Sequence, residues 1–190
     1  MSEALDRKRL FLVGNLSIFM IGLGFAVRAS IAADIQRELF NPLDLARSAG
    51  LVGEVLGATF IGFALTLLFG SALVDRVGMR AMLLFSAVGY LLGSALVVVA
   101  SLIPVSLLSY WLIFAGFLLT GLGWGAVEAA SNPMITAVYP EEKTLRLNIL
   151  HAWWPAGIVV GGIAGLGFAR LGLPWQDNLL MLVIPACGLV

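Results

Sequence analysis

The sequence GLGWGAVEAASNPMITAVYPEEKTLRLN, residues 121–148, contains the end of a long apolar run and the polar turn that follows it. From Ser101 to Pro140 the only charged residue is Glu128, and Asn132 and Pro133 follow it about one helical turn later. A carboxylate inside a membrane span costs roughly 2.5–3.5 kcal/mol on insertion scales, so it is a functional candidate by default. The stretch therefore predicts a membrane helix that carries a carboxylate for a purpose.

Composition predicts a membrane protein rather than a soluble domain. Hydrophobic residues make up 61% of the chain and charged residues 12%, and the mean hydropathy is +1.03. A soluble domain is roughly half apolar and a quarter charged, so this chain has more apolar surface than one soluble core can bury. The formal net charge of zero argues against a nucleic-acid partner. The single cysteine, Cys187, excludes an intrachain disulfide.

Six apolar segments approach the roughly 20 residues that a helix needs to cross a bilayer. None alternates as a strand does, and no linker divides the chain, so residues 1–190 are predicted to form one all-α membrane domain. The predicted spans are residues 10–35, 49–74, 81–101, 105–139, 148–170 and 176–190. The last offers about 22 Å of helix against a hydrocarbon core of about 30 Å. We therefore expect a truncated sixth helix and a longer polypeptide whose C-terminal half is absent.

The N-terminal sequence MSEALDRKRLFLVG has the basic start of a signal peptide. Its apolar run continues from Leu10 to Val27, longer than the usual run of about 7–15 residues, so an uncleaved first span is expected. Basic residues in short loops favour the cytoplasm, which predicts a multi-pass protein of the plasma or inner membrane with a cytoplasmic N-terminus. One predicted side carries Arg7, Lys8, Arg9, Arg76, Arg80, Lys143 and Arg146, and the other carries Arg37, Arg47 and Arg170.

Many of the 22 glycines recur at a spacing of four residues. Small residues at this spacing let helix backbones approach closely in lipid, so tight helix packing is the expected role. A helix pair that also slides or bends is the alternative. The spaced sets are Gly53/Gly57, Gly89/Gly93, Gly121/Gly125 and Gly157/Gly161/Gly165.

A charged turn, SALVDRVGMR at residues 71–80, separates the second and third predicted spans. It resembles the signature Gly-x-Leu-x-Asp-Arg-x-Gly-Arg-Arg between the second and third helices of the major facilitator superfamily. The resemblance implies that a cytoplasmic gate contains Asp75, Arg76, Gly78 and Arg80, whereas a basic turn that only fixes topology is the alternative. Gly78 also permits a tight turn between helices whatever the family. The chain departs from the signature at Ser71 and Met79, which replace a glycine and a basic residue.

The opening stretch extends this resemblance. Residues 128–157 are similar to the fourth-to-fifth helix region of the fucose–glucose–galactose branch of the superfamily, the sugar:proton symporters. The resemblance implies the N-terminal six-helix bundle of that fold, built from a three-plus-three inverted repeat. The shared positions are Glu128, Asn132, Pro133, Thr136, Pro140, Glu141, Arg146, Leu147, Asn148 and Gly157.

Glu128 and Asn132 are the first candidates for a solute and proton cavity. They are four residues apart and share a helix face, while Pro133 removes a backbone donor and loosens the helix there. Arg28 in the first span also needs a partner or water, and we hypothesise that it pairs with Glu128 across the cavity. A static buried pair is the alternative. Asp34, near the outer edge of the first span, is a further candidate, because Ser30 stands where the symporters carry an acid.

The fifth span supplies the remaining candidates. Asn148 and His151 share a helix face, and His151 could titrate near neutral pH. Trp154 could stack on a sugar ring, or it could serve as packing or as an interfacial anchor.

The predicted function is secondary active transport, with proton-coupled uptake of a sugar or similar small polar solute by alternating access. A proton-driven drug or solute exporter is one alternative, although residues 153–162, WWPAGIVVGG, lack the Gly-Pro step typical of exporters. A non-transporting membrane scaffold is another. An enzyme is not expected, since the sequence has no HExxH, GxSxG or phosphate-binding loop. Neither a cofactor nor a metal is expected.

Overall fold

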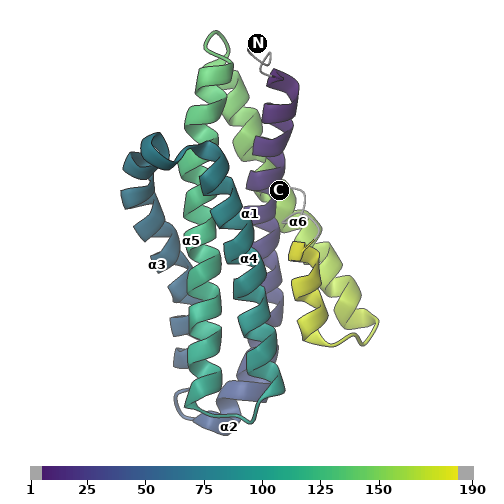
Figure 1. Ribbon diagram of the computed structural model, residues 1–190. Coiled ribbons are helices and arrows are strands. Elements are labelled where there is room, and N and C mark those ends of the chain that lie inside the picture. Colours follow the sequence, from purple (N-terminus) through teal and green to yellow (C-terminus); the bar gives the residue numbers. More distant parts are fainter. Residues whose placement is uncertain (1–5, 184–190) are drawn as a thin grey trace.

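The computed structural model describes residues 6–183 and, within them, every side chain except that of Ser71. These residues form helices and short turns, which confirms the predicted all-α class (Figure 1). Asp6 begins the first helix, because its carboxylate accepts hydrogen bonds from the backbone N–H groups of Lys8 and Arg9. The elements are α1 (Arg7–Ile35), the π-helix η1 (Gln36–Phe40), α2 (Asn41–Leu43), α3 (Ser48–Val77), α4 (Met79–Leu102), α5 (Leu107–Val138), α6 (Lys143–Arg170) and the 3-10 helix η2 (Trp175–Leu182).

Five helices in the described part of the chain are long and apolar enough to cross a membrane. They coincide with the first five predicted spans, although α6 begins at Lys143 rather than at residue 148. The sixth predicted span, residues 176–190, is seen only in part. Its described portion belongs to η2, and residues 184–190 lie outside the described residues.

The first turn is shorter than the predicted spans implied, because spans at 10–35 and 49–74 leave residues 36–48 as the connection. The first helix instead continues through η1 and α2 to Leu43, and the chain turns only at residues 44–47. Pro42 is tolerated because it stands in the first turn of α2, where its missing N–H is not needed. Leu39 and Phe40 are buried, so packing against the core favours the extra helical turn.

Glycines set the closest helix contacts, which lie between α1 and α6, α3 and α5, and α4 and α5. An added Cβ at Gly22 would clash with the Trp154 carbonyl, and one at Gly121 would clash with the Thr59 carbonyl. The packing role predicted for the glycine sets is confirmed for three of them and wrong for one. Neighbouring helices lie against Gly89, Gly93, Gly121, Gly125, Gly157, Gly161 and Gly165, whereas Gly53 and Gly57 face open space.

The packing has the symmetry of an inverted repeat. Exchanging α1, α3 and α4 for α5, α6 and η2 turns the α3–α5 contact into the α6–α1 contact. The same exchange turns the α4–α5 contact into the η2–α1 contact, and all four contacts occur in the structure. Both central helices, α1 and α5, contain glycines at these crossings, for example Gly22 and Gly121. This is the three-plus-three arrangement expected of the fold.

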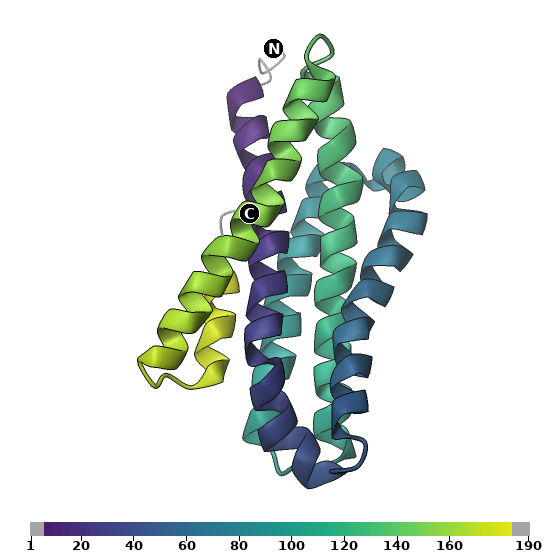
Figure 2. The same ribbon diagram turned by 180° about the vertical axis from the view of Figure 1, so that it is seen from behind.

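Four helices form one side of the bundle. Figure 2 shows α6, α1, α5 and α3 next to one another, while α4 and η2 lie on the other side, which Figure 1 shows. The start of α1, the α3–α4 turn and the α5–α6 turn lie toward the same end of the bundle (Figure 1). Gly78 forms the α3–α4 turn with a φ of +84°, a conformation that favours glycine, as the sequence predicted.

Candidate solute cavity

The central helix α5 carries a row of polar and aromatic side chains. Every fourth residue from Thr120 to Thr136 can form a hydrogen bond. Successive members lie about 6 Å apart along the axis and rotate about 40° around it, so the row winds slowly across the helix surface. Its members are Thr120, Trp124, Glu128, Asn132 and Thr136. This row places hydrogen-bonding groups through the middle of an otherwise apolar bundle.

Arg28 of α1 is held against the start of this row. It is only 4% exposed, and its Nη1 donates a hydrogen bond to Thr120 Oγ1 at 2.8 Å. Its guanidinium carbon lies 4.0 Å from the centre of the Trp124 ring, a cation–π contact. Thr120 in turn donates to the Phe117 carbonyl at 2.9 Å. The threonine hydroxyl is therefore fully engaged, and the guanidinium is fixed in one position.

The hypothesised pair between Arg28 and Glu128 is not formed. Glu128 instead accepts a hydrogen bond from Asn132 Nδ2 at 3.0 Å, and no ion pair of Arg28 occurs among the described residues. The reason is the position of Arg28 along the axis of the bundle. Its hydroxyl partner Thr120 lies two turns, about 12 Å along the axis, before Glu128. Glu128 and Asn132 do share one face, as their spacing predicted.

The ring of Phe117 also lies near the guanidinium, at 5.8 Å, and a chain of ring contacts extends from Trp124 to α3, α1 and α6. Phe60 of α3 contacts Trp124 edge-to-face at 6.4 Å, and Phe25 of α1 contacts Phe60 at the same centroid distance. Phe25 also contacts Trp154 of α6 at 6.1 Å. We call Phe25, Phe60, Trp124 and Trp154 the aromatic cluster. Trp154 contacts Phe25, which lines the small cavity beside Arg28, but Trp154 itself does not line that cavity.

The other candidates on α6 are exposed. Asn148 and His151 lie on the surface of the helix, and in the described part of the chain neither side chain forms a hydrogen bond or ion pair. Both belong to α6, a helix on the four-helix side of the bundle that Figure 2 shows. Their position leaves them available to groups that the structure does not contain.

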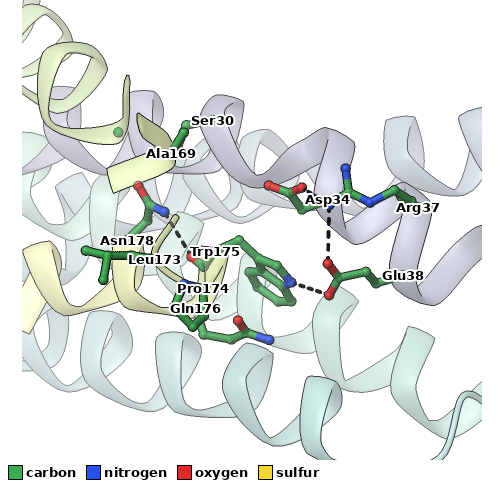
Figure 3. A pocket seen from close by; sticks show the side chains of 11 residues that line it. Ser30, Asp34, Arg37, Glu38, Ala169, Leu173, Pro174, Trp175, Gln176 and Asn178 are labelled. Carbon is green, nitrogen blue, oxygen red and sulfur yellow. Dashed lines mark hydrogen bonds and ion pairs between the residues drawn. The ribbon is translucent and has the colours of Figure 1, made fainter. Parts of the chain in front are cut away.

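Asp34 does not join the other candidates. Its carboxylate forms an ion pair with Arg37 one turn later, and Glu38 pairs with the same arginine at 3.3 Å. Glu38 also accepts a hydrogen bond from the indole of Trp175 at 2.7 Å. Figure 3 shows these side chains around a separate cavity of about 350 Å³ between α1, the end of α6 and η2. Asp34 therefore has a local partner, unlike Arg28.

The predicted gate residues lie at the turn between α3 and α4. Asp75, Arg76 and Arg80 are all exposed, and none has a hydrogen bond or ion pair to another residue in the range 6–183. Of these residues, the structure shows a role for Gly78 alone, whose positive φ allows the tight turn between α3 and α4.

Sequence reasoning missed the groups that hold Arg28. Thr120 and Trp124 precede Glu128 at intervals of four residues, so the periodic row was a signal that could have identified them. Thr59 and Phe60 of α3 carried no comparable signal, because they lie in an apolar run and reach Arg28 only through helix packing.

Comparison with known proteins agrees with this architecture. Residues 10–190 match the family model of the Major Facilitator Superfamily. The chain is 28% identical over 162 residues to the tetracycline resistance protein, class E, of Escherichia coli. It is 24% identical over 127 residues to the L-fucose-proton symporter of Escherichia coli strain K12. It is 31% identical over 125 residues to the minor myo-inositol transporter IolF of Bacillus subtilis strain 168.

These matches cover most of this chain but a smaller part of each relative. They include 85%, 66% and 65% of the chain, and 37%, 28% and 27% of the tetracycline resistance protein, the fucose symporter and the inositol transporter, respectively. The family match, by contrast, extends over nearly the whole sequence, and the fold is the all-α bundle that such a match requires. The chain belongs to the Major Facilitator Superfamily.

Proposed function

We propose that the chain is the N-terminal half-bundle of a secondary transporter, which takes up a small polar solute together with protons by alternating access. The observation that carries this proposal is the row on α5 with the buried Arg28 against it. Polar groups inside a membrane bundle are costly and mark solute or proton pathways. The superfamily match supports transport, and the fucose and inositol relatives support a sugar or polyol as the solute.

Glu128 is the proposed proton carrier. It is half-buried and lies inside a long apolar run, and its partner in this structure is the neutral amide of Asn132 rather than a cation. A carboxylate without a cationic partner can take up and release a proton as its exposure changes. Asn148, His151 and Trp154 on α6 would complete the solute site together with the second half-bundle of the same polypeptide. Transport needs no cofactor or metal.

The gate motif fits the same proposal. Asp75, Arg76 and Arg80 are exposed at the α3–α4 turn, which lies toward the same end of the bundle as the start of α1 (Figure 1). Their charges would pair with the second half-bundle when the cavity is closed to the cytoplasm.

The first test replaces Glu128 with Gln in the full-length protein, reconstituted into proteoliposomes. We expect Glu128→Gln to abolish accumulation of labelled sugar driven by a pH gradient, while sugar exchange across the membrane without a gradient continues. The physical reason is that glutamine keeps the hydrogen bonds but cannot carry the proton. Glu142→Gln, in the exposed α5–α6 turn, is the matched control. Normal gradient-driven accumulation by Glu128→Gln would refute the proton role.

Export is a second candidate, supported by the tetracycline resistance relative, which matches 85% of the chain. The direction of transport distinguishes an exporter from an uptake transporter. The same proteoliposomes, loaded with labelled tetracycline and given an opposite pH gradient, would lose the drug if the protein is an exporter and retain it if the protein takes up polar solutes.

A further inference from the structure

The buried guanidinium of Arg28 has unused hydrogen-bonding capacity. Of its donors, only Nη1 has a partner, the Thr120 hydroxyl, and Nη2 has none among the residues that the structure describes. The side chain is 4% exposed, so water cannot freely satisfy it. Leaving a buried charged donor without a partner is expensive, which indicates that a further group binds there during function.

No carboxylate of the described helices supplies that group. Asp34 and Glu38 pair with Arg37, and Glu128 is bonded to Asn132. Glu54 of α3 accepts a hydrogen bond from the Tyr110 hydroxyl at 2.6 Å and pairs with Arg47 at 3.4 Å. Asp75 lies exposed at the end of α3. The positive charge of Arg28 is therefore not neutralised within residues 6–183.

A small cavity adjoins the guanidinium. Its volume is about 150 Å³, and α1, α3 and α5 all contribute to its lining. At roughly 30 Å³ per water molecule, this space admits a carboxylate and the atoms next to it. Besides Arg28, its polar lining groups are the Thr59 hydroxyl and the Trp124 indole N–H, both buried and without a hydrogen-bond partner in the described part of the chain. Phe25, Phe60 and Trp124 line the remainder with rings.

We propose that this cavity binds the carboxylate of the transported solute, so that the substrate class is polyhydroxylated acids, such as sugar acids, rather than neutral sugars. This inference rests on the proposed transport function and specifies its substrate. A planar guanidinium matches a carboxylate in a two-point hydrogen bond, and the Thr59 hydroxyl can add a third donor. The rings of Phe25, Phe60 and Trp124, which line the cavity, offer apolar surface to the solute. Thr120 and Trp124 hold the guanidinium in place, which lowers the entropic cost of binding.

The same carboxylate chemistry could come from a side chain of the second half-bundle. A protein carboxylate there would neutralise Arg28 permanently and would give no preference for an acidic solute. A solute carboxylate gives such a preference. Comparing D-glucuronate with D-glucose isolates this difference, because the two share a pyranose ring and differ at one carbon, which is a carboxylate in the acid.

The experiment measures equilibrium binding of labelled D-glucuronate and D-glucose to the full-length protein in lipid nanodiscs. We expect the wild type to bind glucuronate at least about tenfold more tightly than glucose, since only the acid can make a charge-assisted two-point contact with the guanidinium. Arg28→Gln should remove this preference, and Arg28→Lys should retain part of it. Arg170→Gln, which changes an exposed arginine at the end of α6, is the matched control and should behave as the wild type.

A second variant covers the case in which Arg28→Gln does not fold. Thr59→Val removes only the unpartnered hydroxyl and should weaken glucuronate binding severalfold more than it weakens glucose binding. Equal binding of the two solutes by the wild type, binding of neither, or wild-type glucuronate affinity in Arg28→Gln would each overturn the proposal.

Transport assays on the same samples separate this inference from the function on which it rests. If the wild type accumulates glucose in a pH gradient and ignores glucuronate, the transport proposal stands and the acid site is refuted. If glucuronate binds through Arg28 but neither solute is accumulated, the acid site stands and the transport proposal is refuted.

Discussion

At the scale of single residues, Thr120 is the residue whose hydrogen bond holds Arg28 in place. Within residues 6–183, its hydroxyl accepts the one hydrogen bond that the Arg28 side chain donates. The same hydroxyl donates a hydrogen bond to the Phe117 carbonyl. Trp124 covers the guanidinium from one turn further along the same helix. Two residues of α5 thus fix a charge that belongs to α1, and their loss would leave that charge buried without a polar contact.

Replacing Thr120 with Val should destabilise the protein by about 1–3 kcal/mol, the usual cost of leaving a buried donor unsatisfied. Valine has nearly the same shape, so packing is retained while the hydroxyl is lost. Thermal unfolding of the full-length protein in detergent measures the effect. Thr136→Val is the matched control. Thr136 lies on the same helix and also donates a hydrogen bond to a backbone carbonyl, but it accepts no hydrogen bond from an arginine within the described residues. Equal stability of the two variants would show that Thr120 does not support Arg28.

At the scale of helices, glycine contacts decide which helices are neighbours. Gly157 of α6 lies against the backbone of Phe19 and Leu23 in α1, and a side chain there would collide with them. Gly162, on the same helix, has open space around it. Lipid offers little hydrophobic drive between helices, so close van der Waals contact of this kind is what holds α1 to α6.

Gly157→Ala should therefore lower the unfolding temperature of the full-length protein and reduce transport. Gly162→Ala should be neutral or slightly stabilising, because alanine favours a helix by roughly 0.5–1 kcal/mol over glycine where there is room. The comparison of the two variants on one helix isolates packing from helix propensity. A loss of stability in Gly162→Ala as large as that in Gly157→Ala would contradict the packing argument.

At the scale of the whole molecule, the distribution of basic residues agrees with the arrangement of the turns. The start of α1, the α3–α4 turn and the α5–α6 turn share one end, and the turn after α2 lies at the other (Figure 1). Seven of the ten basic residues counted in the sequence fall in the first three of these regions. This arrangement supports, as a prediction, a cytoplasmic location for the N-terminus.

Cysteine labelling in intact cells tests this orientation. In a Cys187→Ser background, Leu45→Cys places a thiol in an exposed turn at one end, and Lys143→Cys places one at the start of α6 near the other end. A membrane-impermeant maleimide should label Leu45→Cys in intact cells and Lys143→Cys only after lysis. The reverse pattern would place the N-terminus outside.

The sequence by itself determined the membrane class, the positions of five helices, the Gly78 turn and the shared face of Glu128 and Asn132. These follow from hydropathy, from the conformational freedom of glycine and from helix periodicity, all of which act over a few residues. The tertiary structure alone decided that Arg28 meets Thr120 and Trp124 rather than Glu128, and that Thr59 and Phe60 line the cavity. The physical reason is that these contacts depend on the relative height and rotation of separate helices. Close packing at glycine crossings sets that height and rotation, and no periodicity within a single helix encodes them.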